Sequence, residues 1–306
     1  MSLISFFKGK GLNGFGAGST AEQVTEGIDL AGKTFLLTGC NSGLGLETLR
    51  VLSLRGAHVI AAARTQEKAE NAILAVKADG HSVACELSEP ASVRKCVQLV
   101  EGHGRKLDGI ICNAGIMALP KLQQKHGTEL QFLTNHIGHF ILVTGLLDLL
   151  VENGRVVVLS SSAHKMAPKD VGIEFDNLSG ERGYSSWRAY GQAKLANLLF
   201  AEALAKRFEG TDKTANAVHP GVIRTNLGRH MNPVMNFTMA VSGPLFLKSV
   251  PQGAATQCLV ATRPEVATTS GEYFADCNPA PTSSHGADAE LAERLWTASE
   301  ELVAKL

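Results

Sequence analysis

The 306-residue sequence has no excess of either charge and no long apolar run. Its 29 basic residues balance 29 acidic residues, so the net charge gives no indication of electrostatic binding to nucleic acid. No apolar segment reaches the roughly 18 residues of a membrane span, and the apolar stretch at 3–7 is too short for the core of a signal peptide. The sequence therefore predicts a protein without a membrane span.

Cysteine pairs with the spacing of a zinc site or a redox motif are also missing. None of the six cysteines forms a C-x-x-C pair with another. Such a spread is typical of free thiols in a reducing compartment, and it predicts a cytoplasmic protein without a metal centre. The six positions are Cys40, Cys85, Cys96, Cys112, Cys258 and Cys277.

Strand-like and helix-like segments alternate after a polar, glycine-rich arm at 1–30. Hydrophobic residues make up 44% of the chain, which is ample for a sizeable core. The β–α order predicts the α/β class, with a single doubly wound parallel sheet and helices on both faces in one domain at 31–306. We expect strands at 34–39, 58–63, 82–87, 108–112, 155–161, 214–219 and 271–274, and helices at 44–55, 66–79, 90–103, 127–150, 188–208 and 287–304.

A glycine-rich turn follows the first expected strand. Gly39, Gly43 and Gly45 follow the apolar run 34–37, and a helix begins among them near Leu44. Glycines let the backbone approach a pyrophosphate closely, and the first N–H groups of a helix bind anions. The spacing is G-x3-G-x-G rather than the common G-x-G-x-x-G fingerprint. The turn indicates a dinucleotide site, although a turn that only packs a helix against a sheet has similar glycines.

About 150 residues further on, Tyr190 and Lys194 form a Y-x3-K pair. Residues four apart lie on one face of a helix, so the phenol and the ammonium can share a site. The pair follows an apolar strand that ends in Ser160, Ser161 and Ser162. Because ligands of open α/β sheets bind at the carboxyl ends of the strands, this order favours a catalytic site over a solvated helix face.

These motifs resemble the short-chain dehydrogenase/reductase superfamily, and within it the branch of retinol dehydrogenases and the WW-domain oxidoreductase. The resemblance covers roughly residues 20–300 and implies a Rossmann-type, nicotinamide-dependent oxidoreductase. It is carried by the stretches 38–45, 113–115, 135–140 and 190–194, by Ser161, by His219-Pro220-Gly221 with Thr225, and by Gly271-Glu272-Tyr273-Phe274.

The resemblance implies a cofactor site built from several of these stretches. Glu86 stands where the family usually has Asp beside the adenine, and Cys112 replaces the usual Asn before Asn113. Thr225 would contact the nicotinamide carboxamide. The expected cofactor-binding residues are Gly39, Asn41, Ser42, Gly43, Leu44, Gly45, Glu86, Leu87, Asn113, Ala114, Gly115, Tyr190, Lys194, Pro220, Gly221, Val222 and Thr225.

The second expected strand, 58–63, ends without the acid that binds the ribose 2′-hydroxyl in NAD enzymes of this fold. No Asp or Glu occurs at 57–66, and Arg64 follows the strand. A guanidinium binds a phosphate bidentately, and Asn41 and Ser42 can donate to the phosphate from the glycine turn. The sequence predicts NADP(H) as the cofactor; the alternative is that Arg64 only caps a surface turn.

The expected reaction is hydride transfer between nicotinamide and a carbonyl or alcohol carbon, with Tyr190 as the acid/base. A phenol pKa of about 10 reaches ~7 only with about 4 kcal/mol of preferential phenolate stabilisation, and Lys194 supplies a positive charge for it. Ser161 would donate to the substrate oxygen. Strand alternation places Ser160 and Ser162 on the opposite face, and the resemblance also selects the middle serine.

Two further roles are implied by the resemblance alone. Lys194 would also hydrogen-bond the nicotinamide ribose, and Asn135, the fourth catalytic residue, would hold a water that links Lys194 to solvent. A kink-forming Asn bonded to the backbone is a compatible alternative. His136 and His139 share a helix face, but no further ligand stands at a suitable spacing for a metal, so we expect packing histidines.

Two long segments, 162–187 and 222–250, interrupt the β–α order and are expected to be substrate loops. Methionine adapts to irregular apolar shapes, so a lipophilic small-molecule substrate is predicted; the alternative is a Met-rich lid that packs on the sheet. A homo-oligomer is left open. The methionines in segments expected on the substrate side are Met117, Met166, Met231, Met235 and Met239.

Two other functions stay open alongside a carbonyl reductase or alcohol dehydrogenase. One is a cofactor-binding sensor or scaffold without turnover. The presence of all four catalytic residues is evidence against it. The other is reduction of a carbon–carbon double bond, because the Tyr190–Lys194 pair can serve both reactions.

Overall fold

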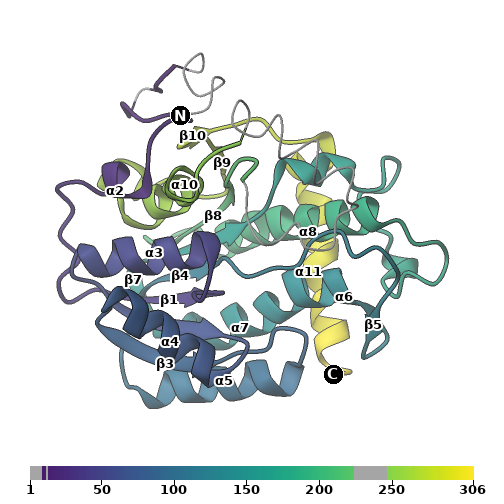
Figure 1. Cartoon of the computed structure of the whole chain (residues 1–306). Helices are drawn as coiled ribbons and strands as arrows, with labels where there is room; N and C mark the ends of the chain where they lie inside the picture. Colours follow the sequence, from purple (N-terminus) through teal and green to yellow (C-terminus); the bar gives the residue numbers. More distant parts are fainter. Residues whose placement is uncertain (1–8, 12, 224–246) are drawn as a thin grey trace.

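The computed structural model describes residues 9–11, 13–223 and 247–306 and is built around one sheet of eight strands (Figure 1). The strand order is β10-β9-β8-β7-β4-β1-β2-β3. Neighbouring strands are parallel except for β9 and β10, which form an antiparallel hairpin. The predicted doubly wound α/β sheet with helices on both faces is confirmed.

The central strands consist of short apolar runs because both of their faces are covered. Every residue of β1 and β2 is buried. The third strand begins two residues before the predicted 82–87 and ends earlier, so Glu86 and Leu87 follow it. The strands are β1 Thr34–Thr38, β2 His58–Ala63, β3 Gly80–Ala84, β4 Leu107–Cys112, β7 Leu150–Leu159, β8 Thr214–His219, β9 Tyr273–Ala275 and β10 Asn278–Pro279, with a separate pair β5 Gln124–Lys125 and β6 Thr128–Glu129.

The helices divide between the two faces of the sheet. Buried residues of α2, α3, α4 and α10 form one apolar cluster, and those of α5, α7, α8 and α11 form the other. The helices are α2 Ala21–Val24, α3 Gly43–Leu54, α4 Gln66–Val76, α5 Pro90–Gly102, α6 Leu130–Phe132, α7 Gly138–Leu146, α8 Ser186–Arg207, α10 Val250–Thr262 and α11 Ala289–Val303.

Two helices lie where the sequence pattern indicates none. Helix α2 falls in the predicted arm, and its Ala21 and Val24 are fully buried. It packs against α10, which follows the predicted loop at 222–250. The division into an arm at 1–30 and a domain at 31–306 stays a prediction, but α2 belongs to the same apolar cluster as α3 and α10.

The helix predicted at 127–150 is a chain of shorter pieces. After α6 comes a π-helical turn, Leu133–Ile137, then α7 and a 3-10 turn at Leu147–Leu149. The stretch Leu130–Leu149 is long and apolar enough to cross a membrane, but 78% of its most apolar window is buried in the fold. It packs against α5 and α8 as a core helix.

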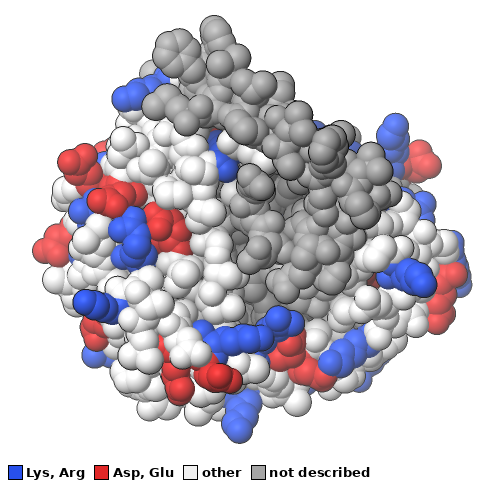
Figure 2. Space-filling view, in the orientation of Figure 1, with Lys and Arg blue, Asp and Glu red and all other residues white. Residues whose placement is uncertain are grey.

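Charged side chains of both signs are interspersed over the described surface that Figure 2 shows. The predicted substrate loop at 162–187 contains two 3-10 turns, Ser162–Met166 and Phe175–Asn177. The loop predicted at 222–250 falls largely outside the described residues. Its two ends meet, because the Lys248 N–H donates to the Val222 carbonyl at 2.9 Å and Ile223 forms a β-bridge with Lys248.

The start of α7 predicts a strong effect of one methyl group on stability. A Cβ on Gly138 would collide with the carbonyl oxygen of Leu87. Gly138→Ala should therefore lower the free energy of unfolding by about 1–3 kcal/mol, since the packed backbone must move. Gly102→Ala is the control, because a Cβ at this position in α5 meets open space. This substitution should leave the free energy of unfolding unchanged or raise it by up to about 1 kcal/mol. Equal urea midpoints for both variants would contradict this packing.

Candidate active site

The glycine turn forms the opening between β1 and α3. Gly39 and Gly43 adopt φ values of +67° and +53°, which L side chains rarely do. A Cβ on Gly45 would collide with the carbonyl oxygen of Gly39. Asn41 and Ser42 are exposed. Within the described residues the Ser42 side chain makes no capping bond to α3, so the first N–H groups of this helix are available to an anion.

The hydroxyl of Thr38 ties the glycine turn to the end of β4. Its Oγ1 accepts from the N–H groups of Asn113 and Ala114, both at 3.0 Å, and lies 2.9 Å from Nε2 of His139. The Asn113 Nδ2 donates in return to the Thr38 carbonyl at 2.8 Å. Thr38 thereby positions the predicted cofactor residues Asn113 and Ala114. The sequence predicts no separate role for Thr38, which lies within the matching stretch 38–45.

His139 links this junction to Asn135. Its Nδ1 lies 2.9 Å from the carbonyl oxygen of Asn135, which can only accept, so Nδ1 carries the proton. Burial lowers the pKa of His139 to about 4, so the ring is neutral and its Nε2 accepts from the Thr38 hydroxyl. Burial also lowers the pKa of His136 to about 3. Among the described residues no group of His, Cys, Asp or Glu is placed to hold a metal ion.

Asn135 lies fully buried at the centre of the π-helical turn. Its Oδ1 accepts from the N–H of Ile116 at 2.8 Å, and its Nδ2 donates to the Ile116 carbonyl at 2.9 Å. Asn135 therefore holds the chain just after Gly115, and a Cβ on Gly115 would come within 3.0 Å of its Oδ1 and 3.7 Å of the Lys194 Nζ. The backbone-bonded arrangement is present, and the water-holding role stays a prediction.

Helix α8 brings Tyr190 and Lys194 to the end of β7. The Lys194 Nζ donates to the Leu159 carbonyl at 2.8 Å and lies 5.8 Å from the centre of the Tyr190 ring. The side chain of Ser161 lies close enough to the Tyr190 phenol to lower its pKa. Ser161 follows β7 and caps the 3-10 turn Ser162–Met166, with its Oγ accepting from the Ala163 N–H at 3.1 Å. The structure thus brings the predicted phenol, ammonium and middle serine together.

The neighbouring serines have other environments. The Ser160 Oγ is buried and donates to the carbonyl of Lys194 at 2.7 Å, whereas Ser162 is exposed. Close packing sets the position of Tyr190: a Cβ on Gly191 would lie 2.7 Å from the N of Ala167 and 2.8 Å from the carbonyl oxygen of Ala163. Only glycine at this position lets α8 lie against the turn that begins with Ser161.

Burial shifts the pKa values of both central groups away from charge. It raises the pKa of Tyr190 to about 12, against a lowering by the hydrogen bond to Ser161. It lowers the pKa of Lys194 to about 8, against a raising by Cys112. The phenol is therefore a neutral proton donor at neutral pH. The Lys194 ammonium can stabilise negative charge on a group that binds beside it.

The remaining predicted cofactor residues lie around the same sheet edge. Arg64 is exposed directly after β2, and makes no hydrogen bond or ion pair with any described residue. Leu87 is buried, and the Glu86 carboxylate is bonded to the N–H and hydroxyl of Ser88 at 3.1 and 3.0 Å. That engagement leaves less of the Glu86 carboxylate for an adenine than the sequence suggests.

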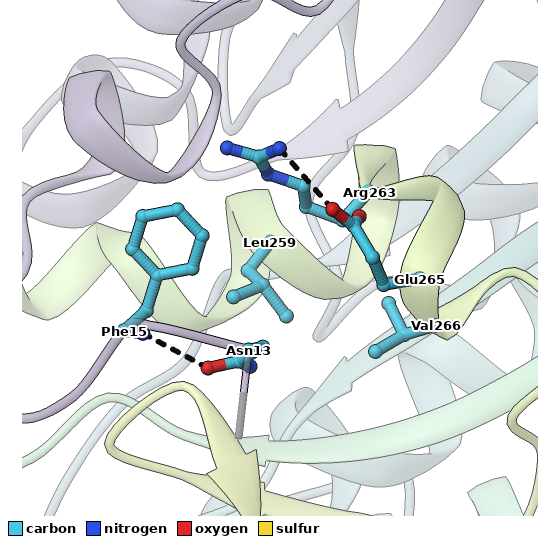
Figure 3. A pocket seen from close by; sticks show the side chains of 6 residues that line it. All are labelled: Asn13, Phe15, Leu259, Arg263, Glu265 and Val266. Carbon is cyan, nitrogen blue, oxygen red and sulfur yellow. Dashed lines mark hydrogen bonds and ion pairs between the residues drawn. The ribbon is translucent and has the colours of Figure 1, made fainter. Parts of the chain in front are cut away.

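Pro220, Gly221 and Val222 follow β8, and Gly221 adopts a φ of +92°. Thr225 lies outside the described residues, as do Met231, Met235 and Met239. A small hollow beneath the N-terminal segment contains none of the predicted site residues (Figure 3). It is lined by Asn13, Phe15, Leu259, Arg263, Glu265 and Val266.

The comparisons with known proteins agree with this geometry. The family model for short chain dehydrogenases matches residues 33–172. The Brassica napus protein Short-chain dehydrogenase TIC 32 A, chloroplastic, is 42% identical over 100% of both chains. This chain belongs to the short-chain dehydrogenase/reductase family. Human retinol dehydrogenase 14 is 36% identical over 94% of this chain and 92% of its own length. This chain therefore falls in the retinol-dehydrogenase-like branch of the family, as its motifs predict.

Solved structures of family members share the fold. A crystal structure from Mycobacterium paratuberculosis is 33% identical, with a TM-score of 0.75, and covers 92% of this chain and 97% of its own. A short chain dehydrogenase from Burkholderia cenocepacia, solved in complex with NADP, is 22% identical, with a TM-score of 0.64, over 81% of this chain and 98% of its own. The second likeness concerns the fold alone.

The lowered pKa of Lys194 makes stability depend on pH. Between its folded value of about 8 and the ordinary 10.5, the unfolded chain binds a proton that the native protein lacks, so stability rises with pH through this window. We expect the wild type to gain about 1–2 kcal/mol relative to Lys194→Met between pH 8 and 9.5, measured by urea unfolding. The raised pKa of Tyr190 acts in the opposite direction only above about 10. A pH-independent difference would contradict the burial of Lys194.

Proposed function

We propose that this family member is an NADP(H)-dependent carbonyl reductase or alcohol dehydrogenase that acts on a lipophilic small molecule, with Tyr190 as its acid/base. The observation that carries the proposal is the meeting of three groups at the end of β7: the Tyr190 phenol, the Ser161 side chain that lowers its pKa, and the buried ammonium of Lys194. A substrate oxygen placed between the two hydroxyl groups would meet two donors at the same time.

The residues of this chain fit a nicotinamide dinucleotide. Gly39, Gly43 and Gly45 let the backbone come close, and the free N–H groups at the start of α3 suit a pyrophosphate. Bound NADP(H) would supply or accept the hydride. Arg64 and Ser42, both exposed, would hold its 2′-phosphate, and no acid at 57–66 would repel that phosphate.

Each catalytic side chain has a separate task in reduction. Ser161 donates to the carbonyl oxygen and stabilises the negative charge that develops there. Tyr190 gives its proton to the same oxygen, and Lys194 stabilises the phenolate that remains. Oxidation of an alcohol reverses these proton movements. Asn135 fixes the Gly115–Ile116 backbone beside Lys194 through its two bonds to Ile116.

Two exposed apolar side chains support a lipophilic substrate. Met166 is 47% exposed just after Ser161, and Val222 is 55% exposed after β8. Both lie in the segments that border the catalytic residues in sequence and in the fold. Exposed apolar side chains beside a polar reaction centre suit a molecule with one carbonyl or hydroxyl on a larger apolar body.

The two alternatives differ in what they require of the site. A cofactor-binding sensor needs no grouped proton donors, and the placement of Ser161 and Lys194 beside the Tyr190 phenol favours an enzyme over it. Reduction of a carbon–carbon double bond would use the same Tyr190. Assays of NADPH oxidation with aldehydes, ketones and enones, followed by identification of the product, distinguish all three. The small-molecule partner, the cytoplasmic location and any homo-oligomer stay predictions, and the TIC 32 A relative is described as chloroplastic.

The preference for NADPH over NADH is predicted to depend on Arg64. Arg64→Ala should weaken NADPH binding about 10- to 100-fold, because a charged hydrogen-bonded contact of roughly 1.5–3 kcal/mol is lost, and should leave NADH binding unchanged. Lys68→Ala is the control. Lys68 is also exposed and lies in α4, so its substitution removes one positive charge, as Arg64→Ala does. Isothermal titration of the three proteins measures both affinities. Equal binding of NADPH and NADH to the wild type would refute the assignment.

Substitution of Tyr190 distinguishes an enzyme from a cofactor-binding sensor. Tyr190→Phe should keep NADPH affinity but lower kcat for a carbonyl substrate by about 10²- to 10⁴-fold, because only the proton donor is removed. Tyr184→Phe is the matched control: its hydroxyl donates to the Leu119 carbonyl at 2.6 Å and should not affect kcat. Steady-state assays of NADPH oxidation compare the two variants. Full activity of Tyr190→Phe would show that another group donates the proton.

A further inference from the structure

The peptide bond between Ser161 and Ser162 is held on both sides by imidazole rings. The Nδ1 of His164 lies 2.7 Å from the carbonyl oxygen of Ser161, and the N–H of Ser162 donates to Nδ1 of His219 at 3.2 Å. One ring therefore donates to this peptide and the other accepts from it. Neither histidine is among the residues that the sequence assigns to the site.

The environment of His164 allows only one arrangement of its proton. A carbonyl oxygen can only accept, so Nδ1 must carry hydrogen. Its Nε2 accepts from the N–H of Ser283 at 3.1 Å and must therefore be bare. The ring is 1% exposed and packs edge-on against Tyr273, with ring centres 5.1 Å apart. Burial lowers the pKa of His164, which keeps the ring in this neutral form.

These contacts connect Ser161 to a distant part of the chain. Ser283 precedes the 3-10 turn Ser284–Ala287 that leads to α11. The ring of His164 bonds to both Ser283 and the Ser161 carbonyl, so this C-terminal segment supports the backbone of Ser161. Ser161 lies beyond the end of β7 and lacks the hydrogen bonds of a strand partner on either side. The direction of its hydroxyl therefore depends on the bond from the Ala163 N–H and on how the peptide that follows is held, where the His164 backbone N–H also donates to the Ser161 carbonyl at 3.0 Å.

We propose that His164, with His219 on the other side of the same peptide, is a positioning residue that fixes Ser161 against the Tyr190 hydroxyl. This inference rests on the proposed function. A shift of about 1 Å in a reacting group can reduce the rate about 100-fold, so rigid support of the Ser161–Ser162 peptide would contribute directly to kcat. Binding of the cofactor at the glycine turn would be little affected by changes at His164, because the ring of His164 contacts Ser161, Ser283 and Tyr273 instead.

Two substitutions of His164 separate its two hydrogen bonds. The amide of Asn reaches the position of Nδ1, and the amide of Gln reaches the position of Nε2. His164→Asn should keep the bond to Ser161 and retain most of the turnover. His164→Gln should keep only the bond to Ser283, and we expect kcat to fall about 10- to 100-fold with the NADPH affinity unchanged. His285→Gln is the control, because His285 bonds to the Lys169 carbonyl instead.

Kinetics and thermal unfolding of the three variants test the proposal. A merely structural histidine would lower kcat only in proportion to stability, with no difference between His164→Asn and His164→Gln at equal stability. That result would overturn the inference. Crystal structures of both variants give a readout that does not require turnover: the Ser161 Oγ should stay beside the Tyr190 hydroxyl in His164→Asn and move away from it in His164→Gln.

Nitrogen NMR of histidine-labelled wild type provides a second readout independent of activity. His164 should show the tautomer with a protonated Nδ1 and a bare Nε2; the opposite tautomer would overturn the inference. If the wild type reduces no carbonyl compound, the proposed function fails, while the crystal structures and the tautomer still decide whether His164 positions Ser161. If the wild type is active and His164→Gln matches it, only the inference fails.

Discussion

The buried ammonium of Lys194 imposes the arrangement on which the rest of the site depends. A buried cation must be compensated by hydrogen bonds, and the Lys194 Nζ finds its acceptor in the Leu159 carbonyl at the last residue of β7. The same carbonyl accepts from the Asn197 Nδ2 at 2.9 Å, and the Ser160 hydroxyl donates back to the Lys194 carbonyl. These bonds fix α8 against β7 in one register, and that register places Tyr190 beside Ser161.

Neutral histidines connect the elements around this centre. His139 joins the π-helical turn to the Thr38 hydroxyl, and His164 joins the Ser161 turn to the segment before α11. In each ring one nitrogen donates to a carbonyl oxygen and the other accepts, so both rings are fully used without a charge. Burial makes such a link rigid, since a rotated or protonated ring would leave polar groups unpaired. Packing histidines are what the sequence predicts at 136 and 139, and the structure shows what their hydrogen bonds add.

Several features of the fold were hidden from the sequence for identifiable reasons. Helix α10 has buried residues along almost its whole length, from Gln252 to Thr262, so no polar face marks a helical period. Helix α2 spans only Ala21–Val24, too short for a periodic pattern, and is stabilised by the capping box of Thr20 and Gln23. The β3 strand alternates weakly in burial, which explains why its predicted limits were shifted toward Glu86.

The sequence by itself determined the β–α order, the glycine turn behind β1 and the presence of Tyr190 and Lys194 on one helix face, because these depend on local spacing. It also indicated Ser161, which the family resemblance and the alternation of the expected strand 155–161 both select. Only the tertiary structure decided that Asn135 binds the Ile116 backbone, that His219 accepts from the Ser162 N–H, and that His164 joins the Ser161 turn to Ser283. Contacts between residues distant in sequence follow from how helices register against strands, and that register is set by packing and buried hydrogen bonds rather than by any local pattern.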